Sequence, residues 1–86
     1  MMFIPKEKLK SGAYYEGRCR NTSLARWNGT VFVYWRYKMG EHFLDEIGCP
    51  EDERYHGHDV FLASRELKDL PKGCRAIPCS ATPEKK

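Results

Sequence analysis

Residues 30–38 are almost all β-branched or aromatic, a composition typical of a β-strand. Because side chains alternate between the two faces of a strand, this segment divides into two sets. The first set is apolar and is predicted to face the core: Val31, Val33, Trp35 and Tyr37. The second set mixes rings with cations and is predicted to face outward, as a recognition surface: Phe32, Tyr34, Arg36 and Lys38.

The dipeptide Asn28-Gly29 stands just before this strand. Asn-Gly is the strongest short-range signal for a two-residue type I′ hairpin turn, in which both central residues need φ > 0. We therefore expect residues 23–27 to pair antiparallel with residues 30–38. Trp27, beside the turn, is expected to be an exposed anchor for a partner, whereas Trp35 should lie in the core.

Two further strands are predicted on either side of this hairpin. Residues 13–20 alternate as a strand does, and Gly17 within them indicates a bulge or a close approach of another backbone. Residues 41–47 fit a strand, but their apolar positions also fit helical spacing, so both assignments stay open.

The last predicted elements lie after residue 59. Residues 60–63 read as a short strand, and Ser64 can cap a single helical turn over residues 64–70, which Pro71 would end. From Lys72 onward, glycine, prolines and basic residues predict a largely disordered tail over residues 73–86.

Four or five short strands joined by tight turns indicate a mainly β fold, with a β-rich α+β fold as the alternative. We expect a small antiparallel meander curled into a partly closed, SH3-like barrel. The single β-rich domain should span residues 12–72 and follow an N-terminal lead-in of residues 1–11. Within that lead-in, Pro5 can open one helical turn.

Length and composition favour one small soluble domain. The chain has 86 residues, and no apolar run approaches the roughly 18 residues of a membrane-spanning helix. The first residues do not resemble a secretory signal, so a cytoplasmic location is expected. In that reducing compartment the four cysteines should be free thiols.

The net charge of +3 hides an uneven distribution along the chain. Residues 1–38 carry eight bases and two acids, a net +6, whereas residues 41–69 carry nine acids and three bases, a net −6. This division is unlike a uniformly basic nucleic-acid binder. It suits oriented docking of a protein partner or self-association of two copies.

The leading functional hypothesis is a non-enzymatic interaction module that binds a protein partner or forms a homo-oligomer, with a dimer expected. Tyr, Trp and Arg dominate interface energetics, and they are frequent in this chain. The alternative is nucleic-acid binding by the same face, with bases stacked on rings and cations along phosphates. Both hypotheses use one candidate set: Tyr14, Arg18, Arg20, Arg26, Trp27, Phe32, Tyr34, Arg36 and Lys38.

Other chemistries are supported less well, and we expect no cofactor, no catalytic residue and no metal. Zinc ligands are present without a typical structural-site spacing: Cys49, His56, His58, Cys74 and Cys79. The acidic run 51–53 lacks the alternate spacing of a calcium loop. Cys49 or Ser64 with a histidine could form a nucleophile–base pair, but no nucleophile elbow or phosphate loop accompanies either residue.

Three short runs, residues 12–17, 25–29 and 50–52, resemble the short uncharacterised proteins of bacterial accessory or mobile DNA, of phage, plasmid or integron-cassette type. The resemblance covers about two-thirds of the chain. It implies no named family, no activity and no site residue.

Overall fold

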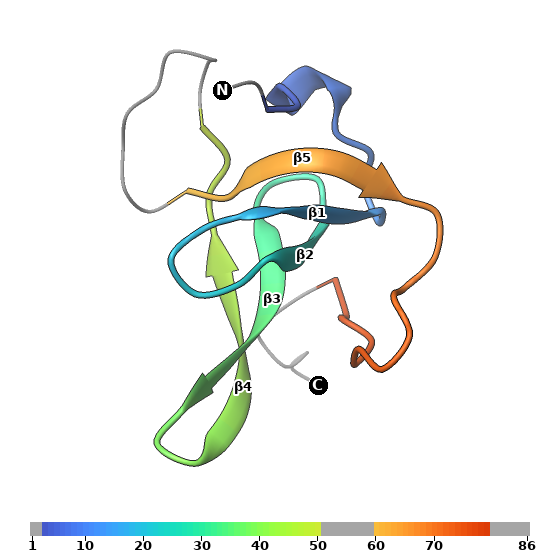
Figure 1. The fold of residues 1–86 in the computed structure, drawn as a ribbon. Coiled ribbons are helices and arrows are strands. Elements are labelled where there is room, and N and C mark those ends of the chain that lie inside the picture. Colours follow the sequence, from blue (N-terminus) through green and yellow to red (C-terminus); the bar gives the residue numbers. More distant parts are fainter. Residues whose placement is uncertain (1–2, 51–59, 80–86) are drawn as a thin grey trace, which may run out of the picture.

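The computed structural model describes residues 3–50 and 60–79. The chain forms one 3-10 turn, η1 (Lys6–Lys8), and then five strands (Figure 1). The strands are β1 (Tyr14–Arg18), β2 (Leu24–Trp27), β3 (Phe32–Lys38), β4 (Glu41–Ile47) and β5 (Leu62–Leu67). The fold is therefore mainly β, as the sequence predicts, and residues 41–47 are a strand and not a helix.

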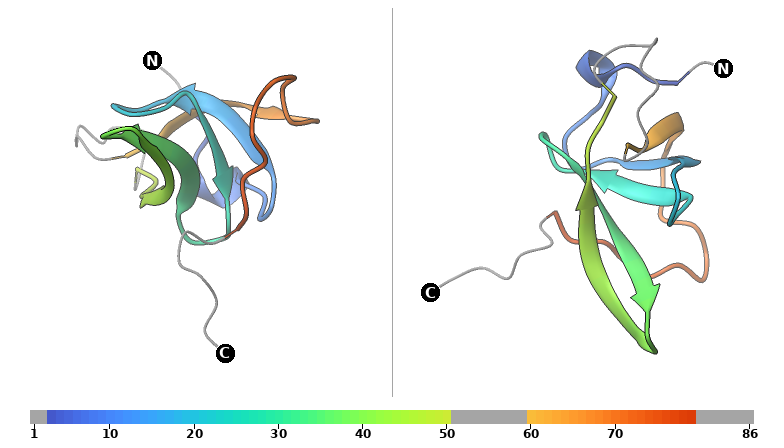
Figure 2. Two further views of the ribbon diagram at one scale, coloured as in Figure 1. Left: turned by 90° about the horizontal axis from the view of Figure 1, so that it is seen from below. Right: turned by 90° about the vertical axis from the view of Figure 1, so that its left-hand side faces the viewer.

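The five strands form one antiparallel sheet in the order β4-β3-β2-β1-β5. The first four make a meander, and the last strand returns to pair with the first. The sheet is curled but not closed into a barrel: between its two edge strands the described residues supply only an isolated bridge, Gly48 to Val60. The β3–β4 hairpin extends away from the other strands, as the right-hand view of Figure 2 shows.

Pairing with β1 also overturns the helical turn expected within residues 64–70. Leu67 lies opposite Tyr14, and Arg65 lies opposite Glu16, so this segment is a strand. The register shifts between Glu16 and Gly17, which confirms the expected irregularity there. A Cβ at position 17 would overlap the Leu62 carbonyl oxygen, so only glycine lets β1 and β5 approach this closely.

The main core lies on the face that was expected to be the recognition surface. Phe32 and Tyr34 are 0% and 1% exposed and belong to the buried cluster. The rest of that cluster comes from every part of the sheet: Tyr15, Ala25, Trp27, Ile47, Phe61 and Ala63. The predicted division of β3 into an inner and an outer face was therefore wrong. Val33, on the opposite face, is also fully buried.

The tight two-residue turn lies at a different place from the one predicted. A hairpin does join β2 and β3, but Asn28 accepts the Val31 amide with its side chain and the connection spans residues 28–31. Met39 and Gly40 have φ of 53° and 82°, and the strands pair on either side of them. These φ values are those of a type I′ turn, so the two-residue type I′ turn joins β3 to β4 and not β2 to β3.

Two arms of the chain cover the two faces of the sheet. The N-terminal arm, residues 3–10, lies against the main core, where Ile4 and Leu9 pack on the cluster. The C-terminal arm, residues 74–79, crosses the opposite face, and its Ile77 is 2% exposed. The predicted tail of residues 73–86 is therefore wrong for its described part. Residues 80–86 lie outside the described residues.

Candidate functional site

The nine predicted binding residues do not form one surface. Trp27, Phe32 and Tyr34 are 3%, 0% and 1% exposed, so the expectation that they present rings to a partner was wrong. Their rings instead pack together in the core, where Phe32 lies 4.8 Å from Trp27 between ring centroids. Each buried aromatic ring removes a large apolar surface from water, so these three rings stabilise the fold and are not available to a partner.

Tyr14 and Arg26 lie side by side on the opposite face and hold the chain's own backbone. The Arg26 guanidinium lies 5.1 Å from the centre of the Tyr14 ring. It donates one hydrogen bond to the Gly12 carbonyl, at 2.8 Å, and another to the Ile77 carbonyl, at 2.6 Å. The Tyr14 hydroxyl accepts the Ile77 amide at 3.1 Å.

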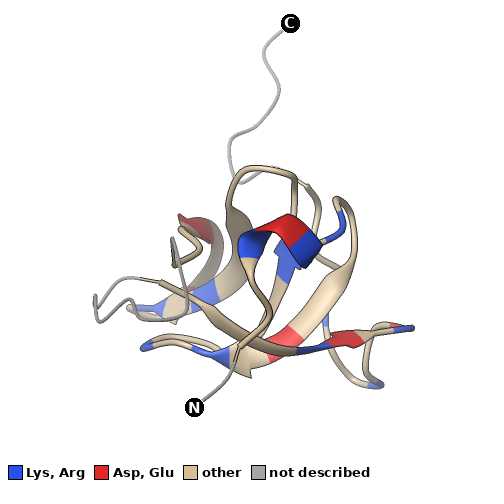
Figure 3. Cartoon of the chain, turned by 90° about the horizontal axis from the view of Figure 1, so that it is seen from above, with Lys and Arg blue, Asp and Glu red and all other residues tan. Residues whose placement is uncertain are grey.

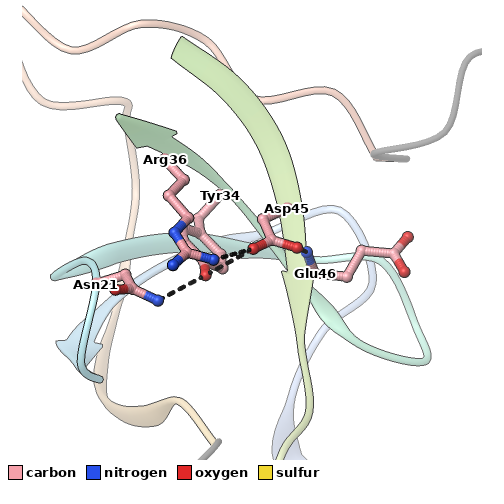
Figure 4. A network of polar contacts seen from close by, with 5 residues as sticks. All are labelled: Asn21, Tyr34, Arg36, Asp45 and Glu46. Atoms are coloured by element: carbon pink, nitrogen blue, oxygen red, sulfur yellow. Dashed lines mark hydrogen bonds and ion pairs between the residues drawn. The ribbon is translucent and has the colours of Figure 1, made fainter. Parts of the chain in front are cut away.

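Arg36 belongs to a polar network between β3 and β4 (Figure 4). Its guanidinium donates to the Asp45 carboxylate at 3.0 Å, and the Tyr34 hydroxyl donates to the same carboxylate oxygen at 3.3 Å. The Asn21 amide completes the network by donating to the Tyr34 hydroxyl at 3.2 Å. Arg36 is therefore tied to an acid of the neighbouring strand.

The pKa values of the Tyr34 hydroxyl and the Asp45 carboxyl shift in opposite directions. Burial raises the pKa of the Tyr34 hydroxyl, and the nearby Asp45 carboxylate adds to the shift. Burial would also raise the pKa of Asp45. However, the bonds from the Glu46 amide, Arg36 and the Tyr34 hydroxyl outweigh burial and lower it. The network therefore keeps Asp45 ionised and Tyr34 protonated, and it holds β3 to β4.

The remaining candidates, Arg18, Arg20 and Lys38, are exposed at different places on the surface. The charge division along the chain does not become a division across the described part of the molecule, because the acid-rich strand β4 pairs with β3, which carries two bases, and β5 carries one acid and one base. Ion pairs join the two classes: Arg36 with Asp45, Lys10 with Glu66 and Arg65 with Glu16. Figure 3 shows blue and red segments interleaved over η1, β1 and β5.

The large apolar side chains that the described chain exposes gather on the β3–β4 hairpin. Tyr37, Met39 and Phe43 are 63%, 91% and 39% exposed. Sequence reasoning assigned Tyr37 to the core and gave no role to the other two. These residues lie close to the β3–β4 turn, where no other strand packs against the hairpin. Their nearness to a turn is the sequence signal that could have indicated exposure.

The outer edge of β4 is the second feature of this hairpin, because no described strand pairs with it. Lys38 and Glu41 close the two-residue turn as a hydrogen-bonded pair, and such pairs alternate along an antiparallel ladder. The main-chain groups of His42, Leu44 and Glu46 therefore point away from β3. The Glu46 amide agrees with this assignment, since it donates to the Asp45 side chain at 2.8 Å.

Among the described residues, the cysteines have no neighbours that would complete a metal site. Cys49 is half-buried, and burial raises the pKa of its thiol. Cys74 and Cys79 are exposed, and all four cysteines are free. Within residues 3–50 and 60–79 no three His, Cys, Asp or Glu side chains are grouped closely enough for a metal ion. His56, His58 and the acidic run 51–53 lie outside the described residues.

Comparisons with protein-family models, with curated proteins and with solved structures find no match for this chain. The resemblance to accessory-DNA proteins therefore stays a prediction. None of the helices in the described part of the chain has the length and apolar character needed to cross a membrane.

Proposed function

We propose that this chain is a non-enzymatic self-associating module, in which β4 of one copy pairs antiparallel with β4 of a second copy. The observation that carries the proposal is the β3–β4 hairpin: an edge strand of seven residues that carries exposed Phe43 and follows exposed Met39 of the turn. An unpaired edge offers a ready template for another strand, and exposed apolar groups supply the energy of docking.

The outward main-chain groups fix the register of such a pair. The amide of Glu46 is already occupied by Asp45, so His42 and Leu44 supply the bonds. Antiparallel pairing of these two residues with Leu44 and His42 of a second copy places the twofold axis at Phe43. Phe43 then faces Phe43 of the second copy in a non-hydrogen-bonded pair, where side chains approach most closely.

This register also sets Asp45 opposite Glu41 of the second copy, and the two carboxylates need neighbouring bases to approach. On the same face of the hairpin, Arg36 pairs with Asp45 at 3.0 Å, and Lys38 lies opposite Glu41 in the register. Each carboxylate therefore has a base of its own copy beside it. Of the predicted site, Arg36 and Lys38 keep a place in this proposal, as the polar rim of the contact.

Sedimentation velocity over a wide range of protein concentrations tests the proposal. We expect a concentration-dependent dimer for the wild-type chain and a monomer for Phe43→Ser. Tyr37→Ser is the matched control, because Tyr37 is an exposed ring of the same hairpin but lies on its other face and should leave the dimer intact. A wild-type monomer at every concentration, or equal effects of both variants, would exclude the β4 contact.

The salt dependence separates this function from nucleic-acid binding. A contact made of main-chain bonds and rings should change little with salt, whereas phosphate contacts give a steep dependence. Retention of the chain on single-stranded DNA at low salt, lost on salt addition and unaffected by Phe43→Ser, would favour nucleic acid instead.

A further inference from the structure

The C-terminal arm is held on the sheet in the way that a groove holds a bound peptide. Residues 74–79 form no strand, and the described sheet contacts their backbone through side chains. The Trp35 indole donates to the Ala76 carbonyl at 2.8 Å. Arg26 donates to the Ile77 carbonyl at 2.6 Å, and the Asn28 amide donates to the Cys79 carbonyl at 3.0 Å.

The side chains that make these contacts come from separate elements. Tyr14 of β1 accepts the Ile77 amide, Arg26 belongs to β2, and Trp35 belongs to β3. Main-chain groups are common to all peptides, so this recognition depends little on the sequence of the segment that is held. Only two side chains of the arm add specificity: Ile77, which is buried, and Arg75, which lies 4.7 Å from the Trp35 ring centre.

The arm fills this groove incompletely. A cleft of about 510 Å³ remains where the arm enters, and its lining includes Trp35, Tyr37 and His42. Cys74, the arm residue at this point, is small and exposed. A ligand with a large apolar side chain at that position would bury the exposed ring surface that the arm leaves uncovered.

We propose that this face is a peptide-recognition groove that the chain's own arm occupies in the absence of a partner. The occupant it fits is an extended segment of another protein, with a branched aliphatic residue for the Ile77 position and a large apolar residue three positions earlier. A second copy's arm would gain nothing over the arm already present, because its contacts are the same. A foreign segment gains from the unfilled cleft.

The hinge for release is the connection between β5 and the arm. Pro71 accepts the Cys74 amide at 3.1 Å in a turn, and Gly73 has φ of 85°. Release of the arm therefore requires no strand pairing to break among the described residues. The tethered arm competes at an effective concentration in the millimolar range, so an external peptide must bind better than it does.

The experiment uses fluorescent peptides and the full-length chain. The first peptide is Lys-Gly-Ser-Arg-Ala-Ile-Pro-Ser, which is residues 72–79 with both cysteines replaced by serine. The second carries tryptophan at the position of Cys74, and the third carries serine at the position of Ile77. Each is titrated into wild-type chain and into Ile77→Ser, whose arm has lost its anchor.

We expect the first peptide to bind Ile77→Ser at least tenfold more tightly than it binds wild type. The reason is that the tethered arm of Ile77→Ser no longer competes for the groove. The second peptide should bind roughly fivefold tighter than the first, because its ring enters the cleft. The third should not bind. Trp35→Phe, added to Ile77→Ser, should weaken the first peptide about fivefold by removing the indole donor.

Three outcomes would overturn the proposal. If Ile77→Ser folds but binds neither of the first two peptides, this face is not a peptide-binding groove. If all three peptides bind equally, the groove has no pocket for the isoleucine side chain. A wild-type dimer that Ile77→Ser abolishes would assign the groove to the arm of a second copy. Phe43→Ser should leave peptide binding unchanged, so failure here is separable from failure of the β4 contact.

A second measurement applies if Ile77→Ser does not fold. Excess second peptide is added to isotope-labelled wild-type chain, and the resonances of residues 74–79 are followed. We expect them to move to the positions of a free segment while those of Tyr15 and Ala25 stay in place. Arm resonances that do not respond to saturating peptide would exclude displacement.

Discussion

At the scale of single residues, Gly17 is a position where an added side chain would meet the backbone of the neighbouring strand. An added Cβ would overlap the Leu62 carbonyl oxygen and lie 2.8 Å from the Ala63 Cα atom. We expect Gly17→Ala to lower the free energy of unfolding by about 2–3 kcal/mol, because backbone must move to admit the methyl group. Urea denaturation measures this. Gly48→Ala is the control, since its added Cβ has no atom within 4 Å apart from those of its own residue and its two chain neighbours. A loss as large there would contradict the explanation.

Asp45 makes stability depend on pH in a predictable direction. Its pKa is lowered in the folded chain from the ordinary value of 3.8, so between the two values the unfolded chain binds more protons. The stabilisation is fully present above 3.8 and is lost as the pH falls through the lowered value. We expect Asp45→Asn to be less stable than wild type at neutral pH and to lose less on acidification. Urea denaturation at several pH values checks this, and parallel curves for the two chains would exclude the role of Asp45.

The same ion pair changes what a substitution at Arg36 should do. If Arg36 lay on an outward recognition face, as the alternation of residues 30–38 predicts, Arg36→Glu would leave the fold intact and alter binding. In the structure this substitution places a second carboxylate beside Asp45, so we expect a lower melting temperature as well. Arg36→Gln keeps a hydrogen-bond donor and should cost less. Thermal melts of the two variants distinguish the cases, and equal melting temperatures would show that the charge of Arg36 is irrelevant to folding.

At the scale of elements, the β3–β4 turn has a residue that does not suit its conformation. Met39 has φ of 53°, where asparagine is tolerated far better than an unbranched apolar residue. We expect Met39→Asn to raise the free energy of unfolding by about 0.5–1 kcal/mol. Gly40→Ala, at φ of 82°, should lower it by about 1 kcal/mol. Chemical denaturation of both variants tests the turn type, and opposite signs from these would contradict it.

The elements that sequence reasoning placed correctly are those with strong local signals. β-branched and aromatic residues predicted β3, and Gly17 predicted the irregularity in β1. The segment Ser64–Leu67 has helical propensity and a capping serine, yet it is a strand, because pairing with β1 outweighs local preference. Such pairing joins residues far apart in sequence, so no local pattern contains it.

The candidate site was harder to predict than the strands because burial depends on the arms. Alternation shows which residues of β3 share a face but not which face is covered. At Phe32, Val33 and Tyr34 both faces are covered, since the arm lies over the second one. Residues 73–79 contain glycine and proline and read as a tail, so nothing along the chain indicated that Ile77 would be buried.

At the scale of the whole molecule, a curled sheet with a different arm on each face can lose one arm without losing the other. The N-terminal arm donates its Ile4 amide to the Ala63 carbonyl of β5 and packs on the main core. The C-terminal arm is held by side chains on the opposite face. Because opening energies follow local packing, we expect the C-terminal arm to open well below the global unfolding energy.

Native-state hydrogen exchange measures this difference in one experiment. The Ile77 amide, bonded to the Tyr14 hydroxyl at 3.1 Å, should exchange faster than the amides of Tyr15 and Ala25 in the core strands. Tyr14→Phe removes the hydroxyl and keeps the ring, so it should speed exchange at Ile77 and leave Tyr15 unchanged. If Ile77 instead exchanges at the rate of the core in both chains, the arm and the sheet unfold as one unit. The arm would then be a permanent part of the fold, and no peptide could replace it while the sheet remains intact.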